Sequence, residues 1–295
     1  MKTKIGYRIL CIIGSLVLLW GGLAFGEQQI LEVTQDELTA SGSDTLMLTL
    51  NIAAAKVTIS PSTEPGVAIR AIVDYSHPNL APSLYKTSSG SLYFAVFDSG
   101  LIMGPIPQGT VHEWQISIGN YDTDTKIEIN FGGVMGNMDF GAAPLTQMVL
   151  NLGGDSVNVD FSSPTRRTVE EIVLNGGGAN VNMMNIGNTN FYTFLLNGGG
   201  LYGILGFHGA LQDGQHNIMA YLGGVSQQWF VPTDAGESVK ALTTAALVNV
   251  AGDGWYTLKK GPVIKEYITT DYDAQPAKLN ISIVAAGSSV KIDRQ

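Results

Sequence analysis

Apolar and polar residues alternate along most of this chain. In residues 127–131 the apolar positions are Ile127, Ile129 and Phe131, and after a pair of glycines comes a second alternating run. Later copies repeat both runs, with Met148, Leu150 and Leu152 before the glycines and Val157, Val159 and Phe161 after them. A period of two with β-branched residues predicts β-strands.

The alternating segments recur between residues 127 and 231 as an internal repeat. Each copy ends in Asn, one variable residue and a Gly pair; the Asn positions are Asn130, Asn151, Asn175 and Asn197, and Tyr221 replaces Asn in the fifth copy. The spacings of 21, 24, 22 and 24 residues indicate stacked units that bury one another's apolar edges. We expect these four asparagines to be turn residues together with the glycines, which supply the positive φ, specifically Gly133, Gly154, Gly177 and Gly199.

Two topologies satisfy this pattern. A hairpin would pair the two runs of one copy across the glycines, whereas a solenoid would pair each run with its equivalent in the next copy. Parallel stacking repeats one position about every 4.8 Å, so a column of Asn side chains can bond along the stack. The sequence therefore predicts an all-β, parallel β-solenoid-like stack of short strands with Gly-rich turns and no significant helix outside the N-terminal leader.

Residues 1–26 have the composition of a targeting segment. Lys2, Lys4 and Arg8 precede an apolar run, and Ala24-Phe25-Gly26 resembles a cleavage site. An uncleaved membrane anchor is the alternative. Either interpretation predicts an extracytoplasmic chain, secreted or membrane-anchored at the cell envelope, with membrane contact only through residues 1–26.

The remaining chain divides into diverged β copies over residues 27–110 and a regular Gly-rich stack over residues 111–295, which we expect to form one continuous domain. Residues 46–59 read as a diverged first copy, and residues 281–292 as a closing copy. Atypical terminal copies are expected because an end unit must block further pairing.

Charge and cysteine content narrow the possible partners. The net charge is −9, and removing the three cations of residues 1–26 takes it to −12, which opposes binding to nucleic acid. The single cysteine, Cys11, lies in the leader, so the rest of the chain has neither disulfides nor thiolate metal sites.

The runs HEWQISIG, IEINFGG, LNLGGDSVNVDF and LNGGGANVNM resemble the toast-rack β domains of envelope proteins. These domains are similar to the C-terminal domain of LiaF-like, cell-wall-active antibiotic response proteins and to the head domains of adhesin-like proteins. The resemblance covers roughly residues 30–292. It implies a non-enzymatic, envelope-facing role in binding or regulation and brings no catalytic residues.

Motifs for cofactors or metals are weak. The glycines of Gly198-x-Gly200-x-x-Gly203 match a dinucleotide fingerprint, but a strand-like pattern follows where a helix is required. The histidines His77, His112, His208 and His216 lack metal-ligand spacing. The acidic pairs Asp122/Asp124 and Asp271/Asp273 lack a complete calcium loop, which leaves a weak calcium site as the alternative. We expect no cofactor and no metal.

Two further groups bear on sugar chemistry. Arg166-Arg167 with Glu170-Glu171 is the charged cluster of the repeats, and we expect it to be a solvated patch. The aromatic residues Trp229, Phe230, Trp255 and Tyr256 are candidates for a sugar platform or for packing at a solenoid end.

Alternation leaves one apolar row facing away from the predicted core: Val149, Val173, Leu195, Met219 and Leu247. Such a row is either covered by this chain's own loops or is a site for a partner or for self-association. The favoured function is an extracytoplasmic, non-enzymatic β-repeat domain in envelope binding, adhesion or signal modulation, whose partner is another envelope protein or polymer. The alternative is a carbohydrate-active enzyme or sugar-binding module on a β-solenoid.

Overall fold

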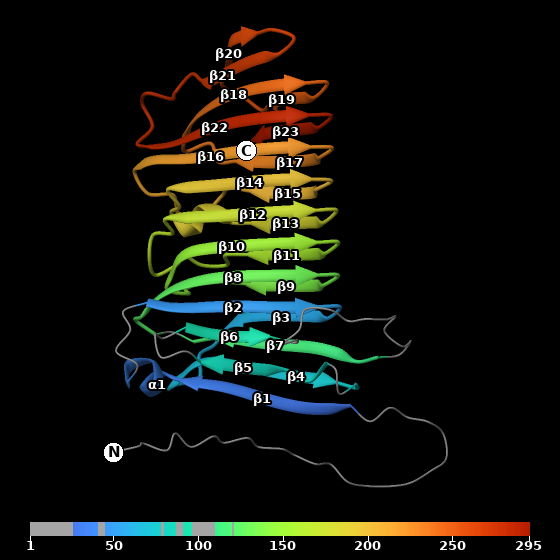
Figure 1. Cartoon of the computed structure of the whole chain (residues 1–295). Coiled ribbons are helices and arrows are strands. Elements are labelled where there is room, and N and C mark those ends of the chain that lie inside the picture. The colour runs from blue at the N-terminus through green and yellow to red at the C-terminus, as the bar shows by residue number, and fades with distance from the viewer. Residues whose placement is uncertain (1–25, 41–44, 78–79, 87–90, 96–109, 120) are drawn as a thin grey trace.

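The chain folds into two large β-sheets stacked against each other (Figure 1). This computed structural model describes residues 26–40, 45–77, 80–86, 91–95, 110–119 and 121–295. The predicted all-β, solenoid-like fold is confirmed, while residues 1–25 of the predicted leader lie outside the described residues.

The two sheets are named here by their position in Figure 1. The back sheet has, in spatial order, β1 (Glu27–Thr34), β4 (Val67–Tyr75), β7 (His112–Ile118), β3 (Lys56–Pro61), β9 (Met135–Asp139), β11 (Ser156–Asp160), β13 (Asn180–Met184), β15 (Tyr202–Gly206), β17 (Ser226–Val231), β23 (Ser289–Arg294) and β19 (Leu247–Ala251). The front sheet has β20 (Trp255–Lys260), β21 (Ile264–Thr269), β18 (Gly236–Thr244), β22 (Ala277–Ala286), β16 (Gly214–Gly223), β14 (Thr193–Gly199), β12 (Glu171–Gly177), β10 (Leu145–Gly153), β8 (Asp124–Gly132), β2 (Thr45–Ala53), β6 (Ser91–Ala95) and β5 (Ser83–Lys86).

Each repeat copy forms one coil with a strand in each sheet. In the first regular copy, β8 lies in the front sheet and β9 in the back sheet, joined by a tight arc. Neighbouring coils pair in parallel and in register, so that Asn130, Asn151, Asn175 and Asn197 stand at one level. Pairing between copies selects the solenoid over the hairpin.

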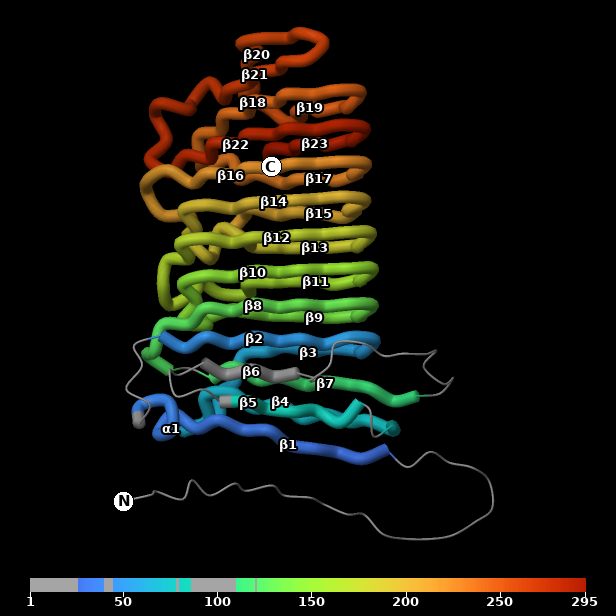
Figure 2. Tube along the Cα trace, viewed as in Figure 1, coloured from blue at the N-terminus to red at the C-terminus, as the bar shows by residue number. Residues whose placement is uncertain are grey.

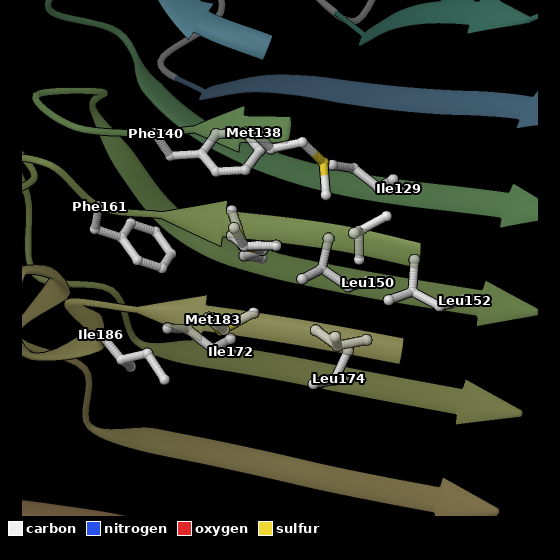
Figure 3. Close-up of a cluster of buried hydrophobic side chains, with 14 of the residues drawn as sticks. Ile129, Met138, Phe140, Leu150, Leu152, Phe161, Ile172, Leu174, Met183 and Ile186 are labelled. Atoms are coloured by element: carbon white, nitrogen blue, oxygen red, sulfur yellow. The ribbon is translucent and has the colours of Figure 1, made fainter. Parts of the chain in front are cut away.

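The inward-facing residues of both sheets form one continuous apolar core. Leu150 and Leu174 from the front sheet meet Met138, Met183 and their neighbours from the back sheet (Figure 3). Phe140, Phe161 and Ile186 close the core at the side where the chain passes to the next coil. The strands are amphipathic because only one face of each sheet contributes to this core.

The left-handed residue of each arc is the one that follows the front strand. Gly133 and Gly154 occupy this position with φ of 69° and 72°. The expectation for Gly177 and Gly199 is wrong, because these two end the front strands and the positive φ falls on Gly178 and Gly200. Three glycines follow one another here, so the sequence does not show which of them has the positive φ. The register of β10 with β12 shows that Gly177 is equivalent to Gly153 and not to Gly154.

The order of coils at the two ends departs from sequence order. The C-terminal strands β22 and β23 lie between the coil of β16 and β17 and the coil of β18 and β19. The expectation of a closing copy in residues 281–292 is therefore wrong, and Figure 2 shows the C-terminus within the stack. The antiparallel pair β20 and β21 instead extends the front sheet beyond β18.

The helices with bounds in the described part of the chain are short. They are α1 (Gln35–Ala40), beside β1 and β4, and the 3-10 helix η2 (Ile186–Thr189) in the crossing after β13. None of the helices in the described part of the chain has the length and apolar character needed to span a membrane.

Candidate binding face

A column of asparagines runs along the outer face of the front sheet. Each Nδ2 donates to the Oδ1 of the preceding Asn, at 2.7 Å from Asn130 to Asn51, 2.6 Å from Asn151 to Asn130, 2.7 Å from Asn175 to Asn151 and 2.8 Å from Asn197 to Asn175. These asparagines lie within strands and not in the turns with which the sequence pattern grouped them. The bonds hold neighbouring coils in one register.

An apolar row lies beside this column on the same face. Val149, Val173, Leu195 and Met219 are paired in register on β10, β12, β14 and β16. The first three are half-buried by their neighbours in the sheet, and Met219 is 36% exposed. Figure 1 shows no described element of the chain in front of these strands.

The predicted fifth member of the row is wrong. Leu247 lies on β19 in the back sheet, where it pairs with Ser289, so it faces away from the other four. In the front sheet the row continues instead from Met219 to Ser282 on β22 and Lys240 on β18.

Exposed apolar side chains also continue the asparagine column beyond Asn197. Its next positions are Tyr221, Val284 and Leu242, which are 52%, 44% and 47% exposed. We name the following residues the front patch: Val149, Val173, Leu195, Met219, Tyr221, Val284 and Leu242. Alternation along β22 and β18 shows that Val284 and Leu242 face outward. Their place in the front patch depends on the order of the coils, which the sequence pattern does not indicate.

The apolar row ends in opposite charges. On one side, Glu128 of β8 precedes Val149; it accepts a hydrogen bond of 3.2 Å from Asn130 Nδ2. On the other side, Lys240 follows Ser282, and its side chain is 72% exposed. Lys240 Nζ is 3.9 Å from Glu266 Oε1, at the outer limit of an ion pair.

The outer face of the back sheet is more polar along its central row. A second column of asparagines joins Asn158 to Asn137 at 2.9 Å and Asn182 to Asn158 at 3.0 Å. Polar side chains of Thr58, Gln228, Lys291 and Asn249 extend this row on neighbouring strands, with Ile204 between them. The front patch therefore distinguishes the two faces of the solenoid.

The arginine pair forms ion pairs with two aspartates. Arg166 Nη2 lies 2.7 Å from Asp122 Oδ1, and Arg167 Nε lies 2.8 Å from Asp124 Oδ1. Asp122 and Asp124, one of the two acidic pairs considered for a weak calcium site, therefore both take part in ion pairs. Among the described residues, no group of three or more His, Cys, Asp or Glu side chains is arranged to hold a metal ion.

The fingerprint glycines belong to a β-coil. Gly200 is the left-handed turn residue and Gly203 lies in β15, where a Cβ atom would stand 1.9 Å from the Val181 carbonyl oxygen. A strand and not a helix follows the turn, so the phosphate-binding helix N-terminus of a dinucleotide site is not formed here.

His216, His208 and Trp229 serve packing. His216 is buried, with Nδ1 2.6 Å from the Phe191 carbonyl oxygen, and His208 stacks on Phe230. Trp229 is fully buried and donates its indole N–H to Gln227 Oε1 at 2.8 Å. With Trp229 in the core, the four aromatic residues do not form one sugar platform, although Tyr256 is 61% exposed.

A buried cluster of charged side chains joins the C-terminal coil, formed by β22 and β23, to the neighbouring coil of β18 and β19. Arg294 at the end of β23 contacts Glu237 of β18 and Asp271, with Nη2 2.7 Å from Asp271 Oδ2. Burial raises the pKa of Glu237 to about 8, against the attraction of Arg294. Desolvation also raises the pKa of Asp271, but hydrogen bonds from Arg294, Gln275 and Thr269 outweigh it and lower this pKa to about 2. The only sequence signal near this cluster is the acidic run TTDYD.

No protein-family model matches the chain, and no curated protein matches it. Its fold is similar to that of a "putative cell adhesion protein" from Clostridium sporogenes, at 17% identity over 92% of this chain and 100% of that chain, with a TM-score of 0.47. It is also similar to a "putative adhesin" from Bacteroides fragilis, at 10% identity over 91% of this chain and 97% of that chain, with a TM-score of 0.39.

Proposed function

We propose that this chain is an extracytoplasmic β-solenoid that binds a component of the cell envelope through the front patch, in adhesion or signal modulation. The observation that carries the proposal is the continuity of the patch. Apolar side chains follow one another without a break from β10 to β18, on a face that no described element covers. Contiguous exposed apolar surface marks interaction sites in soluble proteins.

The geometry of the face supports a binding role. Paired asparagine amides give the patch a polar border, and the strands beneath it are held on a rigid two-sheet core. An apolar centre with a polar rim is the arrangement found at protein–protein interfaces. The leader-like composition of residues 1–26 supports placement outside the cytoplasm.

Cysteine labelling tests both parts of the proposal, because the chain has no cysteine after Cys11. Met219→Cys places a thiol on the front patch. Ser226→Cys is the matched control, since Ser226 is exposed on β17, in the same coil but on the back sheet. Each full-length variant is treated with a membrane-impermeant maleimide on intact cells of the native host and again after purification.

The proposal expects the Ser226→Cys thiol to be labelled in both states. The Met219→Cys thiol should be protected on cells by the bound component and should react in the purified chain once that chain is diluted until nothing remains bound to the front patch. Labelling of Ser226→Cys only after cell lysis would overturn the extracytoplasmic location. Equal labelling of Met219→Cys in both states would overturn the front patch as a binding face.

A further inference from the structure

The charges that bracket the apolar row are arranged symmetrically. Seven adjacent strands of the front sheet carry the row, in the order β8, β10, β12, β14, β16, β22 and β18. The middle strand is β14, which places Leu195 at the centre of the row. Glu128 and Lys240 lie three strands away from it on opposite sides.

From this symmetry we infer that the partner of the front patch is a second copy of this chain, bound face to face about a two-fold axis that runs along β14. This inference rests on the proposed function and names the partner of the same face. Such an axis keeps each residue's position along its strand and reverses the order of the strands. The same surface then serves both copies, as in the isologous interfaces of most homodimers.

The two-fold axis brings several complementary groups together, while three apolar residues of the front patch, Val149, Val284 and Leu242, come opposite the polar Ser282, Asn151 and Asn130. Leu195 meets its own equivalent, Val173 meets Met219, and Glu128 meets Lys240, with each of the last two contacts formed twice. In the neighbouring row, Asn175 comes opposite Tyr221, whose hydroxyl can donate to an amide oxygen that has a second lone pair free. Two further charged residues on these strands, Lys126 and Glu171, come opposite the polar Ser238 and Asn217.

The charge pattern also selects this axis over the other face-to-face arrangement. A two-fold axis along the apolar row, across the strands, would place Glu128 against Glu128 and Lys240 against Lys240. Like charges placed opposite each other at an interface are unfavourable, whereas opposite charges stabilise and orient the complex.

Charge reversal tests the pairing of Glu128 with Lys240. The dissociation constant of the dimer is measured by sedimentation of the full-length chain, for Glu128→Lys, for Lys240→Glu, for the double variant and for an equimolar mixture of the two single variants. Each single variant should weaken the dimer by about tenfold or more. The double variant and the mixture should each return to within about threefold of the parent, because every charged pair is then again of opposite sign.

Controls separate this result from misfolding and from a general charge effect. The unfolding midpoint of each variant shows whether it folds. Lys56→Glu is the matched control, because Lys56 is an exposed lysine on the back sheet, and it should leave the dissociation constant unchanged. Leu195→Asp, which opposes two carboxylates at the two-fold axis, should give a folded monomer.

The inference is overturned if the parent chain is monomeric at every concentration, or if the mixture stays as weak as the single variants. Protection of the Met219→Cys thiol on cells with a monomeric parent would leave the proposed function standing with a different partner. A dimer that responds to charge reversal as expected, with Met219→Cys freely labelled on cells, would instead remove the envelope role and keep the self-association.

Discussion

Arg294 Nε lies 2.9 Å from Glu237 Oε2, in an ion pair that is almost completely buried, with side chains 8% and 0% exposed. The pair joins β23 of the back sheet to β18 of the front sheet, so it connects the inserted C-terminal coil to the coil beyond it. Neither of the two atoms has an aligned hydrogen-bond partner. Burial of a carboxylate without such bonds favours its protonated form.

Glu237 makes the stability of the chain depend on pH. Its pKa is raised from 4.5 to about 8, so the folded state binds more protons than the unfolded state between these values. The free energy of unfolding should therefore fall as pH rises through this window. In Glu237→Gln, urea unfolding at pH 5 and pH 8 should show a fall smaller than the parent's by at least about 1 kcal/mol. An equal fall in both chains would show that Glu237 is ionised throughout.

The turn glycines predict a contrast between adjacent positions. Gly178 has φ of 71°, whereas Gly177 does not have a positive φ, and a Cβ at either position would meet nothing within 4 Å. Gly178→Ala should cost about 1 kcal/mol because of its left-handed backbone, and Gly177→Ala less than about 0.5 kcal/mol. Ala54 holds the equivalent turn position with φ of 50°, so Gly178→Ala should still fold. Chemical denaturation of both variants measures the contrast, and equal midpoints would contradict it.

The asparagine column predicts a ranking by position. Asn151 donates to Asn130 and accepts from Asn175, whereas Asn197, at the end of the column, donates to Asn175. Replacing Asn151 by Ala should destabilise the chain by about 1–2 kcal/mol, and Asn197→Ala by about half as much, since each bond contributes about 0.5–1.5 kcal/mol. Thermal or urea unfolding of the two variants would reveal the ranking; a larger loss for Asn197→Ala would argue against the column as a stabilising element.

Leu201 compensates for small residues in the core. Gly176 and Gly198 take the inward positions that Phe131 and Leu152 hold in earlier coils, and a Cβ at Gly176 would lie 2.3 Å from Leu201 Cδ1. Leu201 is fully buried, so Leu201→Ala should cost about 2–5 kcal/mol through the cavity it leaves. Adding Gly176→Ala to that variant should recover part of the loss, as measured by the unfolding midpoint. A further loss on adding the methyl group would show that the two positions do not share a space.

The local pattern of the sequence by itself determined most of the regular stack. Alternation assigned Ile129 and Leu150 to the core and Val173 and Leu195 to the outer face, because successive residues of a strand point to opposite sides. The recurrence of Asn130 and Asn151 at one register determined parallel pairing between copies, because a side-chain column forms only between equivalent positions.

Only the tertiary structure decided which coils are neighbours at the two ends. Alternation assigns a residue to a face but does not name the next strand, since any two strands of the same pattern can pair in parallel. In this chain β18 and β19 come before β22 and β23 in the sequence. In space, however, it is β22 and β23 that lie beside β16 and β17. This arrangement sets Lys240 at the end of the apolar row, three strands from Leu195, whereas Leu247 is outside the row because β19 belongs to the back sheet. The same arrangement also brings Arg294 to Glu237, a contact between residues 57 positions apart that no local pattern indicates.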